Sequence, residues 1–335
     1  MIEENEMKPI VKRILENKSK TIPILSFPSV QLLGISVKEL ISDAQMQVKG
    51  MQAILQRCHV GASLNMMDLS VEAEAFGAAI RTSDDEVPVV VQGIITDIEQ
   101  AADIVVPSLE KGRCSLYIDA VRSAKQVICD VPVLCGCIGP YSLASRLFDM
   151  TELMYACFDD EENTELLLEK TTQFIIHYIE AMKAAGADGV ILAEPVAGML
   201  SPDLASRFST PFVEKIFRAV NDDGFVLVYH NCGNAVGAMT HQLSALSADI
   251  FHFGNAVELQ NMIPAFSEDK IVMGNVDPVL FKNGSPQEIE REVDRVFNAC
   301  KQYNNFMLST GCDIPANAKW ENLDAYFRKV NELYA

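Results

Sequence analysis

The sequence predicts an α/β fold, and within that class a (β/α)8 TIM barrel forming a single domain over residues 1–335. Short, almost continuously apolar runs alternate with longer segments of helical periodicity, which is typical of parallel strands covered by helices. There are eight such runs, which favours a closed barrel over an open sheet, although periodicity alone does not separate the two. A content of 49% hydrophobic and 22% charged residues is that of a globular protein with a large core.

The predicted strands follow one another at regular intervals. The eight apolar runs are residues 22–27, 60–67, 131–137, 187–193, 224–230, 248–254, 270–275 and 304–312. Helical periodicity dominates residues 36–55, 164–186 and 285–302, which lie between these runs. Most of the other connections also contain a turn followed by a helical segment, so the strands should be parallel.

Two segments depart from a simple strand–helix repeat. The first twenty residues predict a helical extension that precedes the first strand. An insert after strand two, from about Ser70 to Asp130, is longer than one strand–helix connection requires. We expect it to add a hairpin or further helices over the mouth of the barrel.

Charge and hydropathy exclude several kinds of partner and location. A formal net charge of −19 repels the phosphates of nucleic acids and anionic lipids, so neither is expected to bind. No apolar run is long enough to span a membrane, and the N-terminal MIEENEMKPIVKR lacks the apolar segment of a signal peptide. We therefore expect a cytoplasmic protein, whose nine cysteines are free thiols or metal ligands rather than disulfides.

The segment YHNCGNAV places a histidine and a cysteine at the end of the fifth run. His230 and Cys232 are two residues apart, so in an extended chain they point to the same side. Cys312 ends the eighth run, and all strand ends of a barrel meet at one face. One nitrogen and two thiolates suit Zn²⁺, and three protein ligands with an open position are typical of catalytic zinc. The alternative is that all three residues only fill core space.

Other polar residues also end predicted strands. Glu194 and Asp277 follow the fourth and seventh runs and are candidate catalytic residues, although each could instead cap a helix. His252 ends the sixth run and could be a fourth metal ligand, a substrate contact or a core residue. Asn275 follows a glycine near the end of the seventh run, where turn chemistry would also explain it.

Several motifs together resemble one known family. They are DLSVEAEAFGA (68–78), VPVLCGCIGPYSLAS (131–145), GADGVILAEPVAGMLSP (186–202), YHNCGN (229–234), GNVDP (274–278) and STGCDIP (309–315). Over nearly its whole length the chain resembles the uroporphyrinogen decarboxylase superfamily, and within it the methylcobamide:thiol methyltransferases of the MtaA/CmuA type. The resemblance implies that His230, Cys232 and Cys312 hold a catalytic zinc ion. It also makes Asp68 and Asn275 candidate cofactor-binding residues.

The same resemblance implies a reaction. Zinc would bind the acceptor thiol as a thiolate, which would take a methyl group from a methylcobamide. The chain has no D-x-H-x-x-G corrinoid-binding segment, so a separate corrinoid protein would carry the methylcobamide and dock at the barrel mouth. Coenzyme M is the thiol used by the best-known relatives, and another acceptor is equally compatible with the zinc site. The assembly state is open, and a homodimer is one arrangement.

Two other functions remain as alternatives. The decarboxylases of the superfamily carry an arginine-rich segment at strand one to bind substrate carboxylates, whereas this chain has LSFPSVQLLG there. A decarboxylase-like lyase acting on a tetrapyrrole should work without metal. A non-catalytic relative could use zinc only to clamp two strands, and its site should be closed by a fourth protein ligand.

Overall fold

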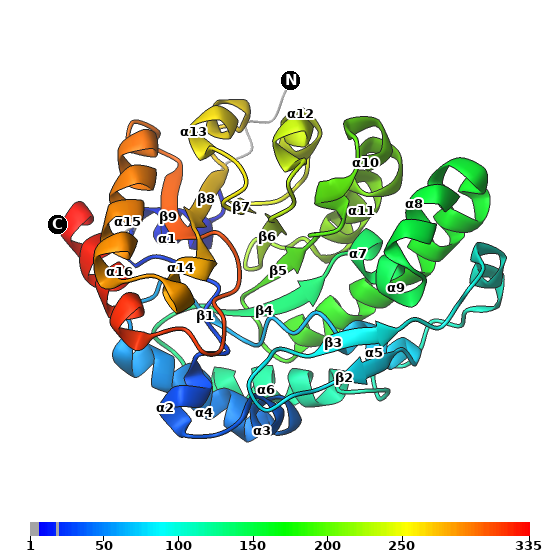
Figure 1. The fold of residues 1–335 in the computed structure, drawn as a ribbon, viewed down its shortest axis with the longest axis horizontal. Helices are drawn as coiled ribbons and strands as arrows, with labels where there is room; N and C mark the ends of the chain where they lie inside the picture. The colour runs from blue at the N-terminus through cyan, green and yellow to red at the C-terminus, as the bar shows by residue number, and fades with distance from the viewer. Residues whose placement is uncertain (1–6, 18–19) are drawn as a thin grey trace.

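A curled sheet of seven parallel strands forms the centre of the molecule, and helices surround it (Figure 1). The computed structural model describes residues 7–17 and 20–335. In spatial order the strands are β1 (Ser63–Leu64), β4 (Val133–Ile138), β5 (Gly189–Ala193), β6 (Val226–Asn231), β7 (Ile250–Phe253), β8 (Ile271–Val276) and β9 (Phe306–Thr310). The α/β class and the TIM-barrel-like arrangement are therefore as predicted.

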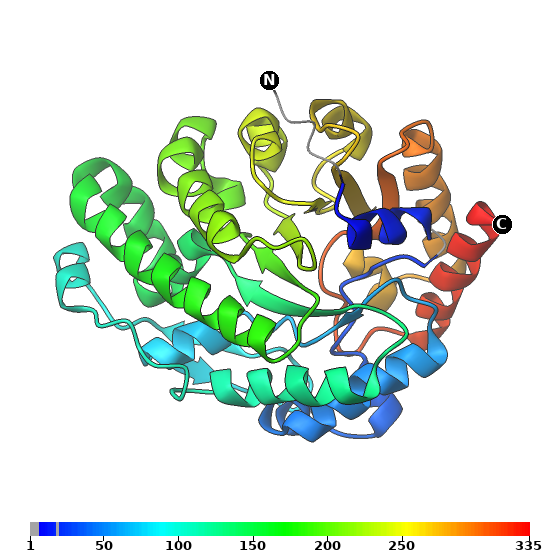
Figure 2. The same cartoon turned by 180° about the vertical axis from the view of Figure 1, so that it is seen from behind.

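Both faces of the central strands are buried, which explains why they read as continuous apolar runs. Alternate residues point inward and pack together in the middle of the curled sheet. Members of this inner cluster are Leu134, Ile191, Val226, Val228, Ile250, Ile271, Met273 and Met307. The helix α1 (Pro9–Glu16) adds Val11 and Ile14 to the same cluster. Figure 2 shows α1, in dark blue, in front of the strands when the molecule is seen from behind.

The prediction of a first strand over residues 22–27 is wrong. This segment is extended and buried but makes no ladder of strand hydrogen bonds. Pro23 has no backbone N–H, and side chains supply the contacts to β9 instead. The Ile24 amide donates to Thr310 Oγ1 at 3.2 Å, and Ser309 Oγ donates to the Ile22 carbonyl at 2.8 Å. The sheet thus has seven strands, with an extended segment lying beside β9.

The connection between β1 and β4 contains more than one helix. It comprises α5 (Val71–Phe76), the antiparallel strands β2 (Ala79–Arg81) and β3 (Val89–Gln92), and α6 (Cys114–Val127). The chain after β3 is tied to the end of α7 (Pro140–Leu147), because the amides of Ile94 and Ile95 both donate to the Leu147 carbonyl. The two-stranded sheet is thereby fixed beside the central one.

The remaining helices form the outer ring. They are α2 (Ser29–Leu33), α3 (Val37–Ser42), α4 (Ala44–Arg57), α8 (Met150–Asp159), α9 (Glu161–Ala184), α10 (Pro202–Phe208), α11 (Thr210–Val220), α12 (Thr240–Ser244), α13 (Leu259–Met262), α14 (Pro278–Asn283), α15 (Pro286–Cys300) and α16 (Trp320–Tyr334). The helix predicted over 36–55 is divided at Asp43, whose carboxylate caps α4. None of the helices in residues 7–17 and 20–335 has the length and apolarity needed to cross a membrane.

Candidate metal centre

The three predicted metal ligands lie together at the carboxyl ends of β6 and β9. His230 belongs to β6, Cys232 is the first residue after that strand, and Cys312 comes two residues after β9. Cys312 Sγ is 3.5 Å from His230 Nε2 and 3.6 Å from Cys232 Sγ. The three ligand atoms all lie within 4.8 Å of one another, close enough to share one metal ion. One imidazole and two thiols form a donor set that fits Zn²⁺.

The backbone holds the imidazole of His230 in the orientation that a metal site needs. Its Nδ1 atom donates to the carbonyl oxygen of His252 at 3.2 Å, since a carbonyl can only accept. The proton is therefore on Nδ1, and the lone pair of Nε2 faces the two cysteines. Histidines that bind metals usually donate their other ring N–H to a carbonyl or carboxylate in this way.

The two thiols affect each other in opposite directions. The Cys312 thiol donates to Cys232 Sγ, and this hydrogen bond lowers the pKa of the Cys232 thiol. The same hydrogen bond, together with burial, raises the pKa of Cys312 to about 12. The Cys312 thiol therefore keeps its proton in the metal-free protein, and a metal ion would displace that proton.

Close backbone packing surrounds the ligand loop, which is the segment of Cys232 and Gly233 after β6. A Cβ atom added to Gly254, which follows β7, would lie 2.6 Å from the Cβ atom of Cys232. One added to Gly233 would lie 2.5 Å from the Cα atom of Gly198, in the loop after β5. Contacts below 3.0 Å leave no room for a side chain at either glycine. The position of Cys232 thus depends on neighbouring loops that approach it without side chains.

His252 lies beside the site but is not one of its ligands in this arrangement. Its Nε2 atom donates to the Thr310 carbonyl at 2.5 Å, and its ring centroid lies 4.7 Å from that of His230, with the two rings tilted by 33°. Burial lowers the pKa of His252 well below its ordinary value, so the ring is neutral. Among the residues described, neither His252 nor any carboxylate joins the group of three ligand atoms.

Glu194 is fully buried at the end of β5. Its Oε1 accepts from the Tyr141 amide at 2.9 Å, and its Oε2 accepts from both the amide and the hydroxyl of Ser142. These donors form the first turn of α7, so Glu194 caps a helix that follows a neighbouring strand. Burial raises the pKa of Glu194 to about 7, and the hydrogen bonds act in the opposite direction.

Asp277 and Asn275 both organise the chain at the end of β8. Asp277 Oδ1 accepts from the Val279 amide at 2.8 Å and caps α14. The buried Asn275 amide donates to the carbonyls of Gly254 at 2.9 Å and Val257 at 2.7 Å. Asn275 therefore holds the loop whose glycine packs against Cys232.

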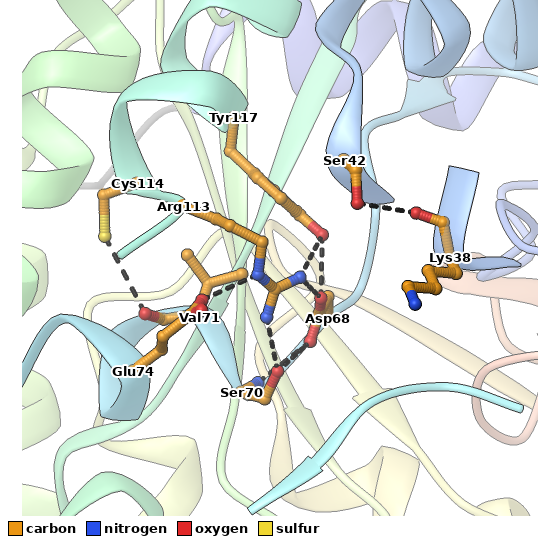
Figure 3. A network of polar contacts seen from close by, with 9 residues as sticks. All are labelled: Lys38, Ser42, Asp68, Ser70, Val71, Glu74, Arg113, Cys114 and Tyr117. Carbon is orange, nitrogen blue, oxygen red and sulfur yellow. Dashed lines mark hydrogen bonds and ion pairs between the residues drawn. The ribbon is translucent and has the colours of Figure 1, made fainter. Parts of the chain in front are cut away.

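Asp68 is the centre of a polar network between β1 and α6 (Figure 3). Its Oδ2 accepts from Arg113 at 2.5 Å and from the Tyr117 hydroxyl at 2.7 Å. Its Oδ1 accepts from the Ser70 hydroxyl at 2.6 Å. Arg113 also pairs with Glu74, as Figure 3 shows, and so neutralises two carboxylates.

Sequence reasoning missed three ionisable groups in this region. Arg113 lies far from any strand end, and only the fold brings it to Asp68. Glu72 is buried, and burial raises the pKa of its carboxyl to about 7. Asp313 follows Cys312, and burial raises the pKa of its carboxyl well above the ordinary value. The adjacency of Asp313 to a predicted ligand was the one signal available in the sequence.

The family is decided by a match over almost the whole chain. Residues 25–333 match the family model described as uroporphyrinogen decarboxylase (URO-D). The chain belongs to the uroporphyrinogen decarboxylase family. Its relatives in this family include proteins with two kinds of name, methyltransferase and decarboxylase.

Similar family members include methyltransferases and a decarboxylase by name. The chain is 26% identical over 265 residues to methylcobamide:CoM methyltransferase MtbA of Methanosarcina acetivorans, covering 76% of this chain and 75% of that protein. It is 27% identical over 279 residues to MtaA of Methanosarcina barkeri, covering 80% and 78%. A uroporphyrinogen decarboxylase of Carboxydothermus hydrogenoformans is 23% identical, covering 89% and 86%.

A solved structure shares the fold. A methyltransferase from Methanosarcina mazei superposes with a TM-score of 0.85 at 23% identity, covering 97% of this chain and 99% of the other. The described part of this URO-D-family chain thus shares the fold of that protein over nearly its full length.

Proposed function

We propose that this URO-D-family protein is a zinc-dependent methyltransferase. It would move a methyl group from a methylated corrinoid, carried by a separate protein, to a thiol such as coenzyme M. The cluster of His230, Cys232 and Cys312 carries this proposal, because its three ligand atoms converge at the face where barrel enzymes act. Similarity to proteins named methylcobamide:CoM methyltransferase supports the same reaction.

The three residues fit a zinc ion that retains an open position. When bound, zinc would supply the charge that keeps a substrate thiol deprotonated at neutral pH. His230 would present Nε2, because His252 fixes its tautomer. Cys232 and Cys312 would bind as thiolates, and the proton they share would leave on metal binding.

The predicted catalytic and cofactor-binding residues enter as parts of this proposal. Glu194 would hold α7 against the site, and the raised pKa of its buried carboxyl leaves it able to exchange a proton near neutral pH. Asp277 would contact a bound substrate from the end of β8. Asn275 would keep the Gly254 loop in place, and Asp68 would present its network with Arg113 toward the corrinoid.

The metal content and the methyl transfer should be measured together. We expect one zinc per chain in the wild type, and loss of both zinc and transfer from methylcobalamin to coenzyme M in Cys312→Ser. Cys129→Ser is the matched control, because Cys129 is an exposed free cysteine outside the cluster. A wild-type protein that remains folded and binds no zinc would exclude the proposal.

The same experiment separates the alternatives. A protein with zinc that transfers no methyl group, and whose zinc has no exchangeable ligand by X-ray absorption, would indicate a structural metal. Decarboxylation of uroporphyrinogen by the metal-free protein would indicate a lyase.

A further inference from the structure

Arg146 is a partly buried charged side chain without a partner among the residues described. Of the arginines in residues 7–17 and 20–335, only Arg113 and Arg146 are not exposed. Arg113 has two carboxylate partners, whereas Arg146 makes no ion pair or side-chain hydrogen bond with any residue that the structure describes. Its Nε atom is buried and unsatisfied. A charge that is partly removed from water and left unpaired carries a desolvation cost, so this guanidinium favours the binding of an anion.

The nearest acids do not neutralise this guanidinium. Asp68 and Glu72 are the two whose charges act on Arg146, and Asp68 is already paired with Arg113. Glu72 is fully buried, which raises the pKa of its carboxyl to about 7 and leaves it only partly ionised at neutral pH. Burial still lowers the pKa of Arg146, but a guanidinium keeps its charge in a protein.

Arg146 lines a cavity of about 270 Å³ near the end of α7. Gln92 and Ser145 provide further polar groups, and Phe148 and Val196 provide apolar walls. Asp149 is the one carboxylate on the wall, and its Oδ1 is engaged with the amides of Thr151 and Glu152 as the cap of α8. A fixed positive charge beside a few polar groups and a short apolar wall suits a small anion.

The cavity and the metal centre share one face of the barrel. Val196 follows β5, and its amide donates to Ser142 Oγ at 3.1 Å. Two residues later, Gly198 packs against Gly233, the neighbour of Cys232. A short stretch of backbone therefore links the wall of the cavity to the ligand loop.

We infer that the Arg146 cavity binds an oxyanion, a sulfonate, carboxylate or phosphate, carried by a ligand of the same face. The identity of the ligand that carries this oxyanion rests on the proposed function. Two sources have this chemistry: the acidic group of the acceptor thiol and the phosphate in the nucleotide portion of the corrinoid. Two parallel N–H donors of a guanidinium match either one.

The test compares ligands that differ only in the anion. The first ratio is kcat/KM for 2-mercaptoethanesulfonate divided by kcat/KM for 2-mercaptoethanol, and it tests the thiol. The second ratio is kcat/KM for methylcobalamin divided by kcat/KM for methylcobinamide, which lacks the phosphate, and it tests the corrinoid. In Arg146→Gln we expect one of these two ratios to fall roughly 10- to 100-fold, the usual effect of losing a charged hydrogen bond. Arg146→Lys should give a smaller fall, because lysine keeps the positive charge but lacks the two parallel N–H donors of the guanidinium. Arg291→Gln, on the exposed surface of α15, should leave both ratios unchanged.

A second readout does not depend on catalysis. Sulfate should raise the melting temperature of the wild type more than that of Arg146→Gln, at equal ionic strength, and Arg291→Gln should respond like the wild type. If Arg146→Gln does not fold, Arg146→Lys takes its place in both assays. Unchanged ratios together with equal sulfate responses would overturn the inference and leave the proposed methyltransferase intact. A protein without zinc or transfer that still loses its sulfate response in Arg146→Gln would support the anion site while the proposed function fails.

Discussion

Gly254 determines how closely the loop after β7 can approach Cys232. Any side chain there would have to displace the cysteine, because its Cβ would lie 2.6 Å from the Cβ of Cys232. We expect Gly254→Ala to weaken zinc binding about 10- to 100-fold, as loss of a supporting group around a metal usually does. Competition with a zinc-binding dye would measure this. Gly237→Ala is the control, since the nearest atom to its Cβ is a methyl group of Val257 at 3.4 Å.

The buried carboxyl of Glu72 should make the stability of the protein depend on pH. Its carboxyl is buried beside α7, with Oε1 accepting from the Ile138 amide at 3.0 Å and Oε2 unsatisfied. Because its pKa is raised to about 7 in the folded protein, folding favours the protonated form. Its contribution to stability is therefore complete below the unfolded pKa of 4.5 and is lost as the pH rises through 7.

Substitution by glutamine isolates this effect. Between pH 5 and 8, the free energy of unfolding of the wild type should fall by about 2 kcal/mol more than that of Glu72→Gln. Urea titrations of both proteins at several pH values would measure the difference. Parallel pH profiles would show that Glu72 ionises in the folded protein as it does in the unfolded chain.

The start of α14 illustrates how one side chain can serve an element and a site together. Asp277 Oδ1 caps this helix through the Val279 amide. Asp277→Ala should therefore reduce stability by about 1 kcal/mol, whereas Asp277→Asn should keep the cap and most of that stability. If Asp277 also acts in the reaction, Asp277→Asn will lower kcat/KM without a matching loss of stability. Full activity in Asp277→Asn would restrict the residue to capping.

The start of a helix could be predicted where its capping residues are close together in the sequence. Ser285 and Glu288 form the capping box that starts α15, and this pattern is visible in the sequence. Glu194 was less predictable, because it caps α7, a helix that begins more than fifty residues earlier. The division of the helix predicted over 36–55 depends on the cap formed by Asp43.

At the scale of the whole molecule, Thr21 helps to attach the first extended segment to the sheet. Its buried hydroxyl donates to the Leu308 carbonyl at 2.5 Å and lies 2.8 Å from the Tyr326 hydroxyl. Thr21→Val should leave these groups unpaired and lower the free energy of unfolding by about 1–3 kcal/mol. Chemical denaturation would measure this, with the exposed Thr151→Val as the control. A change within error would mean that water or Tyr326 replaces the bond.

The barrel topology explains which parts of the site the sequence could predict. His230, Cys232 and Cys312 could be grouped because parallel strand ends converge at one face, whatever their separation along the chain. Arg113 and Arg146 lie in or beside helices with no motif, and their meaning depends on which carboxylates the fold brings near them. The apolar run at 22–27 predicted burial correctly, but apolarity alone does not distinguish a laddered strand from a segment held by side chains.

That side-chain attachment has a consequence for the metal centre. Two ligands extend from β6, which is paired on both sides, whereas Cys312 extends from β9, which among the described residues has a strand neighbour only at β8. Amides of residues 22–27 and β9 should therefore exchange with deuterium faster than those of β5 and β6. A metal ion bound by all three residues would bridge the slowly and the rapidly exchanging parts of the barrel. Adding zinc should then slow exchange around Cys312 more than around His230, so that the ion acts as a cross-link closing the ring of strands.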